Sequence, residues 1–60
     1  MKRKALVKHL VRYGAEFIRE GARHSIYQLN GRFTAVPRHA EIVDSLARKI
    51  CKDLEIPFVR

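Results

Sequence analysis

The sequence predicts an α+β fold in the order α-β-β-β-α, with a three-stranded antiparallel sheet and both helices on one face of it. Two amphipathic helical patterns enclose a central region of β-branched and aromatic residues, and an Asn-Gly pair divides that region. In a chain of 60 residues, this arrangement is the compact way to bury two apolar helix stripes. We therefore expect a single domain over residues 1–60.

The first helix is predicted over residues 2–13, where apolar residues recur at helical spacing. Lys4, Lys8 and Arg12 lie at i, i+4 and i+8, so they form a basic stripe on another face. Gly14 follows at the place where a left-handed residue usually ends a helix.

The second helix is predicted over residues 42–54, and Asp44 and Ser45 suit its first turn. Glu55 stands where glycine would be the usual terminator. One helix face carries all the apolar residues of this segment: Ile42, Val43, Leu46, Ala47, Ile50, Cys51 and Leu54. The single cysteine therefore reads as a core residue of a cytosolic protein rather than as half of a disulfide.

Three strands are predicted between the helices. Residues 15–20 suit a short edge strand, and Gly21 then turns the chain. Residues 24–29 and 32–36 form a hairpin around Asn30-Gly31, which is the preferred pair for a type I′ turn. The proline that follows ends the third strand, because it has no N–H to donate.

Strand alternation leaves the orientation of the middle strand open. Its residues divide into two faces: His24, Ile26 and Gln28 on one, and Ser25, Tyr27 and Leu29 on the other. If Tyr27 and Leu29 are buried, His24 points to the open face of the sheet. If Ile26 is the core residue, His24 lies at an edge or is displaced by a bulge.

The charge balance points to a polyanionic partner. Thirteen Lys and Arg against six Asp and Glu give a net charge of +7, and the pI is near 10.4. Nucleic acid is the usual partner for such a surface, with a solubility charge or an acidic protein partner as alternatives. A chain this short buries only about 60% of its surface, which favours assembly with a partner or a second copy. No membrane-spanning or export segment is predicted, since Lys8, His9 and Arg12 interrupt the apolar N-terminal residues.

The histidines are the remaining candidates for chemistry. His9, His24 and His39 lie 15 residues apart and no cysteine pair accompanies them, so we expect neither a metal site nor a cofactor. His9 is expected in solvent on the first helix, and His39 in a surface loop that could cap the second helix or contact a phosphate. His24 differs, because it follows a glycine loop flanked by Arg19 and Arg23, where an imidazole and cations can converge on one phosphate.

Nearly the whole chain resembles the HicA, or YcfA-like, family of mRNA interferase toxins. The resemblance rests on several segments: the basic first helix ending at Gly14, the strand GARHSIY, the hairpin, VPRH at 36–39, Glu41-Ile42, and the closing helix LARKICKDLEIP. It implies a fold like that of double-stranded-RNA-binding domains, ribonuclease activity on mRNA, and neutralisation by a HicB-type antitoxin. The family's essential histidine falls on His24, where Ala22 and Arg23 occupy the preceding positions.

The resemblance implies metal-independent cleavage of a phosphodiester. An imidazole, whose ordinary pKa is about 6.5, can take the 2′-hydroxyl proton or protonate the leaving oxygen. Arg23 and Arg38 would stabilise the extra negative charge of the transition state, and Lys8 and Arg12 would contact RNA phosphates. A second acid or base is not evident: Tyr27, a water held by arginine, or the same imidazole acting in sequence are the alternatives.

Two further functions remain open at this point. The first is a non-catalytic module that binds double-stranded RNA by its shape and phosphates, although such readers span about 16 base pairs, which is much surface for this chain. The second is a subunit whose basic face serves only a protein partner.

Overall fold

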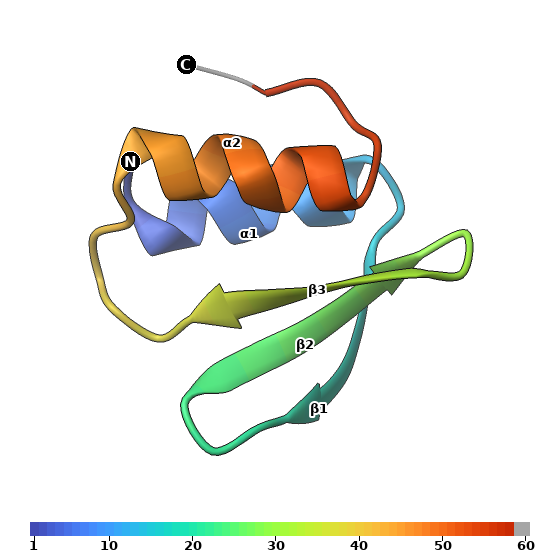
Figure 1. The fold of residues 1–60 in the computed structure, drawn as a ribbon, viewed down its shortest axis with the longest axis horizontal. Helices are drawn as coiled ribbons and strands as arrows, with labels where there is room; N and C mark the ends of the chain where they lie inside the picture. The colour runs from blue at the N-terminus through green and yellow to red at the C-terminus, as the bar shows by residue number, and fades with distance from the viewer. Residues whose placement is uncertain (59–60) are drawn as a thin grey trace.

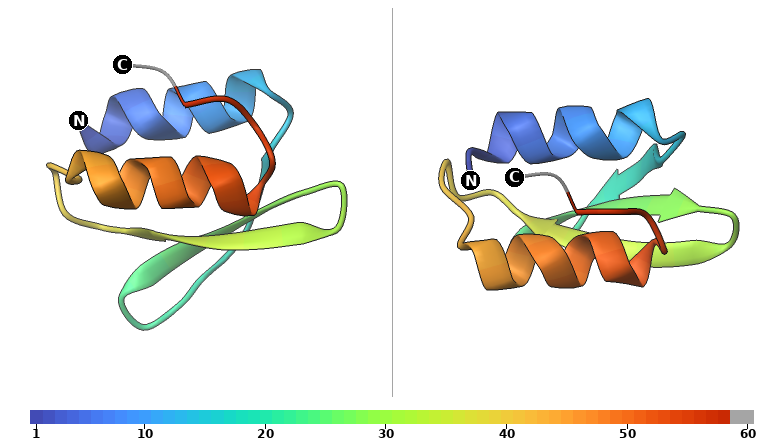
Figure 2. Two further views of the ribbon diagram at one scale, coloured as in Figure 1. Left: turned by 45° about the horizontal axis from the view of Figure 1, so that its top comes forward. Right: turned by 90° about the horizontal axis from the view of Figure 1, so that it is seen from above.

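The computed structural model describes residues 1–58 and confirms the predicted fold class and element order. The elements are α1 (Arg3–Arg12), β1 (Glu16–Glu20), β2 (His24–Leu29), β3 (Arg32–Pro37) and α2 (Asp44–Asp53). The strands form an antiparallel sheet in the order β1-β2-β3, and both helices lie on one side of it (Figures 1 and 2).

The core lies between the helices and the sheet. Ser25 and Tyr27 of β2 are buried, whereas His24 is exposed, so the first of the two strand orientations considered above is the one present. The other face of the sheet, called the open face below, carries no helix (Figure 1). The buried apolar residues come from every element except β1 and from the segments that flank the elements: Leu6, Leu10, Ala15, Tyr27, Val36, Ile42, Ala47, Ile50, Cys51 and Leu54. Cys51 is 1% exposed, which confirms the prediction that it is a core residue, and its burial raises the pKa of the thiol.

Two local features behave as the sequence predicts. Asn30 and Gly31 have φ values of 53° and 81°, the left-handed pair that a type I′ turn requires. Both helices end in the same hydrogen-bond pattern, with Gly14 N–H donating to Val11 O and Glu55 N–H donating to Lys52 O. Glu55, at φ 58°, adopts the left-handed conformation that Gly14 adopts at 98°.

The second helix begins two residues later than predicted. Ile42 is buried, but its N–H donates to Met1 O at 2.8 Å, and Lys2 forms a β-bridge with Glu41. Extended pairing with the start of the chain therefore replaces the first predicted turn. Val43 lies at the N-cap position and is 65% exposed.

The prediction that His9 lies in solvent is wrong. This residue is 8% exposed, and its Nε2 lies 2.6 Å from Pro57 O. Its ring also packs edge-on against Tyr13 at 4.9 Å between centroids. Because Pro57 O is an acceptor, Nε2 carries the proton and ties the segment after α2 to α1.

Among the described residues, no helix is long and apolar enough to cross a membrane.

Candidate active site

His24 opens the central strand and projects from the open face of the sheet. Its Cα partner across β3 is Pro37, whose ring is buried. Its carbonyl accepts a hydrogen bond from Gly21 N–H at 2.6 Å. The turn between β1 and β2, residues 21–23, is therefore closed by a backbone hydrogen bond, while the imidazole remains accessible to a ligand.

Arg19 shares the open face with His24. It is paired with Ile26, because a bulge at Ile18 shifts the register of β1. Paired residues of antiparallel strands project to the same face, so Arg19 is the diagonal neighbour of His24, within reach of a long side chain. The sequence pattern singles out Arg19 as a nearby cation, but only the bulge fixes the face on which it lies.

Gly21 lies close to one nitrogen of the Arg19 guanidinium. A Cβ built on Gly21 would lie 4.0 Å from Arg19 Nη1 and 3.2 Å from the His24 carbonyl oxygen. The second distance is tighter than most real Cβ contacts, so a larger residue would push the turn away from His24. The structure thus places Arg19, Gly21 and His24 together.

Arg23 occupies the last position of the turn and is exposed. Within residues 1–58, neither Arg23 nor Arg19 forms an ion pair with a carboxylate. Two arginines without an acidic partner in this part of the chain are therefore neighbours of His24, Arg23 in the sequence and Arg19 across the β1–β2 pair. Guanidinium groups are suited to bidentate contacts with a phosphate.

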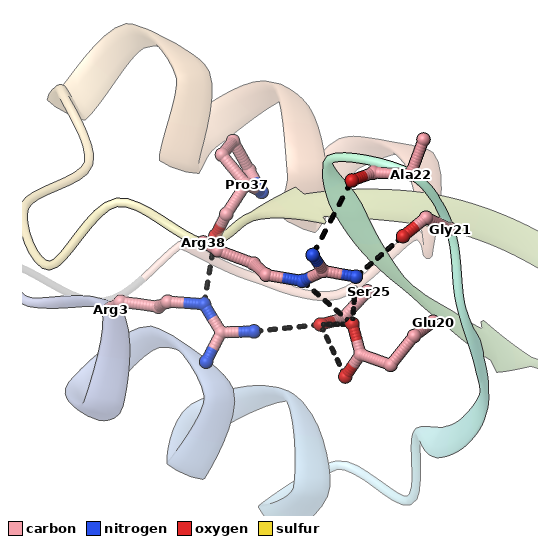
Figure 3. A network of polar contacts seen from close by, with 7 residues as sticks. All are labelled: Arg3, Glu20, Gly21, Ala22, Ser25, Pro37 and Arg38. Atoms are coloured by element: carbon pink, nitrogen blue, oxygen red, sulfur yellow. Dashed lines mark hydrogen bonds and ion pairs between the residues drawn. The ribbon is translucent and has the colours of Figure 1, made fainter.

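Arg38, the other predicted RNA ligand at this end of the sheet, is bonded within the protein (Figure 3). Its Nε donates to Glu20 Oε1 at 2.8 Å, and its two terminal nitrogens donate to the carbonyl oxygens of Gly21 and Ala22. Its Nη2 also lies 2.6 Å from Glu20 Oε1. The guanidinium thus binds both the last residue of β1 and the turn that follows it.

Glu20 connects Arg38 to a second arginine through Ser25. The Ser25 hydroxyl, 1% exposed, donates to Glu20 Oε1 at 3.0 Å and accepts from Arg3 Nη2 at 2.9 Å. Arg3 Nε donates to Pro37 O at 2.8 Å. We call these four side chains, Arg3, Glu20, Ser25 and Arg38, the arginine network (Figure 3).

The arginine network affects the protonation of Glu20. The hydrogen bond from Arg38 is the main cause that lowers the pKa of this carboxyl below its ordinary value, and the Ser25 hydroxyl adds to the effect. Glu20 therefore stays ionised at neutral and mildly acidic pH.

The remaining predicted residues lie away from this site. Lys8 and Arg12 are exposed on α1, in the helical layer, whereas His24 projects from the open face. His39 is exposed in the segment before α2, and Val43 rather than His39 occupies the N-cap of that helix. Of the predicted cations, Arg19, Arg23 and Arg38 lie beside the His24 turn, and Lys8 and Arg12 do not.

Tyr27 is excluded as the partner of His24 in proton transfer. It is 8% exposed on the helix-facing side of β2 and packs edge-on against Phe17 at 5.7 Å between ring centroids. Residues three apart on a strand project to opposite faces. The phenol and the imidazole therefore do not face one substrate.

These features define a small, strongly basic α-β-β-β-α protein in which an exposed histidine opens the central strand, beside two arginines that have no carboxylate partner among residues 1–58. Residues 3–56 match the family model described as the HicA toxin of bacterial toxin-antitoxin systems, and the chain belongs to that family. No curated protein and no solved structure gives a significant match. Membership of this family implies a toxin that has an antitoxin partner.

Proposed function

We propose that this toxin is a metal-independent endoribonuclease that cleaves mRNA in the cytoplasm, stops translation and growth, and is neutralised by a HicB-type antitoxin. The observation that carries the proposal is the exposed His24 at a closed turn, beside Arg19 and Arg23, neither of which pairs with a carboxylate among residues 1–58. Family membership supports the toxin role, and the net charge of +7 favours RNA as the target.

His24 acts in the proposed reaction as a general base or a general acid. As a base it takes the proton of the ribose 2′-hydroxyl, whose oxygen then attacks the adjacent phosphorus. As an acid it protonates the 5′-oxygen that leaves. Positioned proton transfer of this kind contributes about 10²- to 10⁴-fold to a rate.

The arginines stabilise the phosphorane that forms between these two steps. Arg23 lies in the turn itself and Arg19 lies diagonally across from His24, so their guanidinium groups approach one phosphate from two sides. Because Tyr27 faces the helices, the second proton transfer falls to a water held by arginine or to the same imidazole acting in sequence. A single imidazole serving both steps predicts a modest turnover rate.

Lys8 and Arg12 bind RNA phosphates outside the cleavage site in this proposal. They are exposed on α1, as is Lys4, which completes a basic stripe at i, i+4 and i+8. Their role is to hold the RNA through its charge and not through its sequence.

Substitution of the exposed histidines tests the proposal. His24→Gln should lose at least 10²-fold in cleavage of an RNA oligonucleotide in the presence of EDTA, because glutamine does not exchange a proton. His39→Gln, at another exposed histidine, is the matched control and should cleave at the parental rate. Melting curves of both variants should lie close to that of the parent, since each side chain is exposed.

The substrate provides a second control. A 2′-deoxy nucleotide at the cleaved position should prevent cleavage while leaving binding nearly unchanged, because it lacks the nucleophile. Parental activity in folded His24→Gln would contradict the role of the imidazole. RNA binding by the parent with no cleavage would instead favour the non-catalytic RNA-binding module.

A further inference from the structure

The arginine network surrounds the backbone of His24 on three sides. Glu20 and the turn precede it in the chain, Ser25 follows it, and Pro37 lies opposite it on β3. An arginine of the network donates hydrogen bonds to each of these segments. Arg38 bonds the turn. Arg3 bonds Ser25 and Pro37. The network therefore restrains the segments that determine where the imidazole lies (Figure 3).

Arg38 is poorly placed to bind a phosphate. Its Nε, Nη1 and Nη2 all have acceptors within the protein, and its charge is paired with Glu20. An RNA phosphate would have to displace a carboxylate already held by two nitrogens of the same guanidinium. Arg23 has no such partner among residues 1–58, so the two arginines beside the histidine differ in what they can do.

We infer that Arg38 and Glu20 are positioning residues for His24: together they clamp the β1–β2 turn and set the place of the imidazole. This inference rests on the proposed nuclease function for its consequence, since misplacing a catalytic group by about 1 Å can cost 10²-fold in rate. The geometric part stands on the hydrogen bonds from Arg38 to Glu20 and to the carbonyls of Gly21 and Ala22.

Ser25 extends the clamp to the first helix. Its buried hydroxyl bonds both Glu20 and Arg3, and Arg3 bonds the carbonyl of Pro37, the residue paired with His24. Through these contacts the start of α1 and the end of β3 are linked to the turn. The sheet and a helix thus support the histidine, although it lies at the end of a strand.

Kinetic measurements on Glu20→Gln, Arg38→Gln and the double variant test the clamp. Each single variant should lower kcat at least tenfold while KM changes less than twofold. The kcat of the double variant should be no lower than that of the less active single variant, because both residues act as a unit. The kcat of Arg38→Lys should fall as much as that of Arg38→Gln, since an ammonium group keeps the charge but not the forked geometry of a guanidinium.

The matched control is a second exposed Arg–Glu pair at the opposite end of β3. Arg32 Nη2 lies 2.9 Å from Glu55 Oε2, and neither residue contacts the turn. Arg32→Gln and Glu55→Gln should keep the parental kcat. If Arg38 instead binds RNA, Arg38→Gln should raise KM with kcat unchanged and reduce the salt slope of RNA binding by about one, which would overturn the inference.

Amide hydrogen exchange tests the clamp without any nuclease assay. The Gly21 N–H is bonded to the His24 carbonyl, so its exchange reports whether the turn is closed. Arg38→Gln and Glu20→Gln should each speed this exchange at least tenfold in the free, folded protein, and Arg32→Gln should not. Unchanged Gly21 exchange in a folded variant overturns the inference.

The two proposals fail in different ways. If the parent does not cleave RNA but the clamp variants open the turn, the nuclease proposal fails and the clamp stands. If His24→Gln abolishes cleavage but the clamp variants cleave at the parental rate, the inference fails and the nuclease stands. Should Arg38→Gln not fold, the nearly isosteric Glu20→Gln and the charge-retaining Arg38→Lys carry the same measurements.

Discussion

Replacing His9 by alanine should destabilise the protein without changing its chemistry. The variant loses the hydrogen bond to Pro57, which contributes about 0.5–1.5 kcal/mol, and the edge-on contact with Tyr13, which contributes about 0.5–1.5 kcal/mol. It also loses the burial of most of the ring, whose exposed fraction is 8%. The higher helix propensity of alanine offsets about 0.5 kcal/mol, which leaves a net loss of about 2 kcal/mol.

Thermal unfolding followed by circular dichroism measures this loss. For a chain of this size a change of 1 kcal/mol moves Tm by about 4–8 °C, so His9→Ala should lower Tm by about 8–16 °C. His39→Ala, at an exposed histidine, should change stability by less than about 0.5 kcal/mol. A fall of less than about 3 °C in His9→Ala would refute the packing argument, and loss of RNA cleavage in the folded variant would refute its separation from the active site.

Three further predictions concern the turn, acid and salt. Gly21→Ala should lower kcat by roughly tenfold, because its Cβ would lie 3.2 Å from the His24 carbonyl and displace the turn by a few tenths of an ångström; parental kcat would contradict this. The pKa of Glu20 is lowered on folding, so its stabilisation is present above about pH 4.5 and is lost as the pH falls through the lower folded value. Melting curves should therefore show the advantage of the parent over Glu20→Gln shrinking below about pH 4.5, and a constant difference down to pH 3 would exclude the effect. Lys8→Ala and Arg12→Ala should each reduce the salt slope of RNA binding by about one, measured by fluorescence anisotropy, and parental slopes would remove both residues from the interface.

The order of the elements is readable from the sequence because local signals agree with one another. Asn30-Gly31 demands a hairpin wherever it lies between two β-branched segments, and Gly14 ends a helix by its left-handed conformation. Glu55 adopts the same left-handed conformation although it is not glycine. Its place directly after Leu54, the last apolar residue of the helical pattern, is what marks it as the helix terminator. These features depend on neighbours within a few residues.

The environment of His9 could not be found in the same way. Its position, three residues after Leu6 and one before Leu10, places it on the buried stripe of α1, although its sequence neighbour Lys8 is exposed. The carbonyl that bonds its ring belongs to Pro57, 48 residues away. Helical spacing alone could have suggested that His9 is buried. A buried imidazole also needs a hydrogen-bond partner, and that partner depends on how the chain after α2 folds back onto α1.

Sequence patterns predict the candidate site only in part, for the same reason. His24 can be selected from the sequence because a glycine and two arginines precede it, but the faces of β1 depend on a bulge that the pattern does not reveal. Without the bulge, Arg19 would project with Phe17 toward the helices. With it, Arg19 joins His24 on the open face.

Charge composition identifies cations but not which of them are available to RNA. Four arginines surround His24, and two of them, Arg3 and Arg38, have protein acceptors, whereas Arg19 and Arg23 have no carboxylate partner within residues 1–58. Glu20 makes this division, because a single ionised carboxylate 18 residues before Arg38 is enough to hold that guanidinium in place. On the proposed function, Glu20 therefore decides which arginines position the imidazole and which can meet a phosphate. Turnover and RNA affinity should then respond to different arginines at one site.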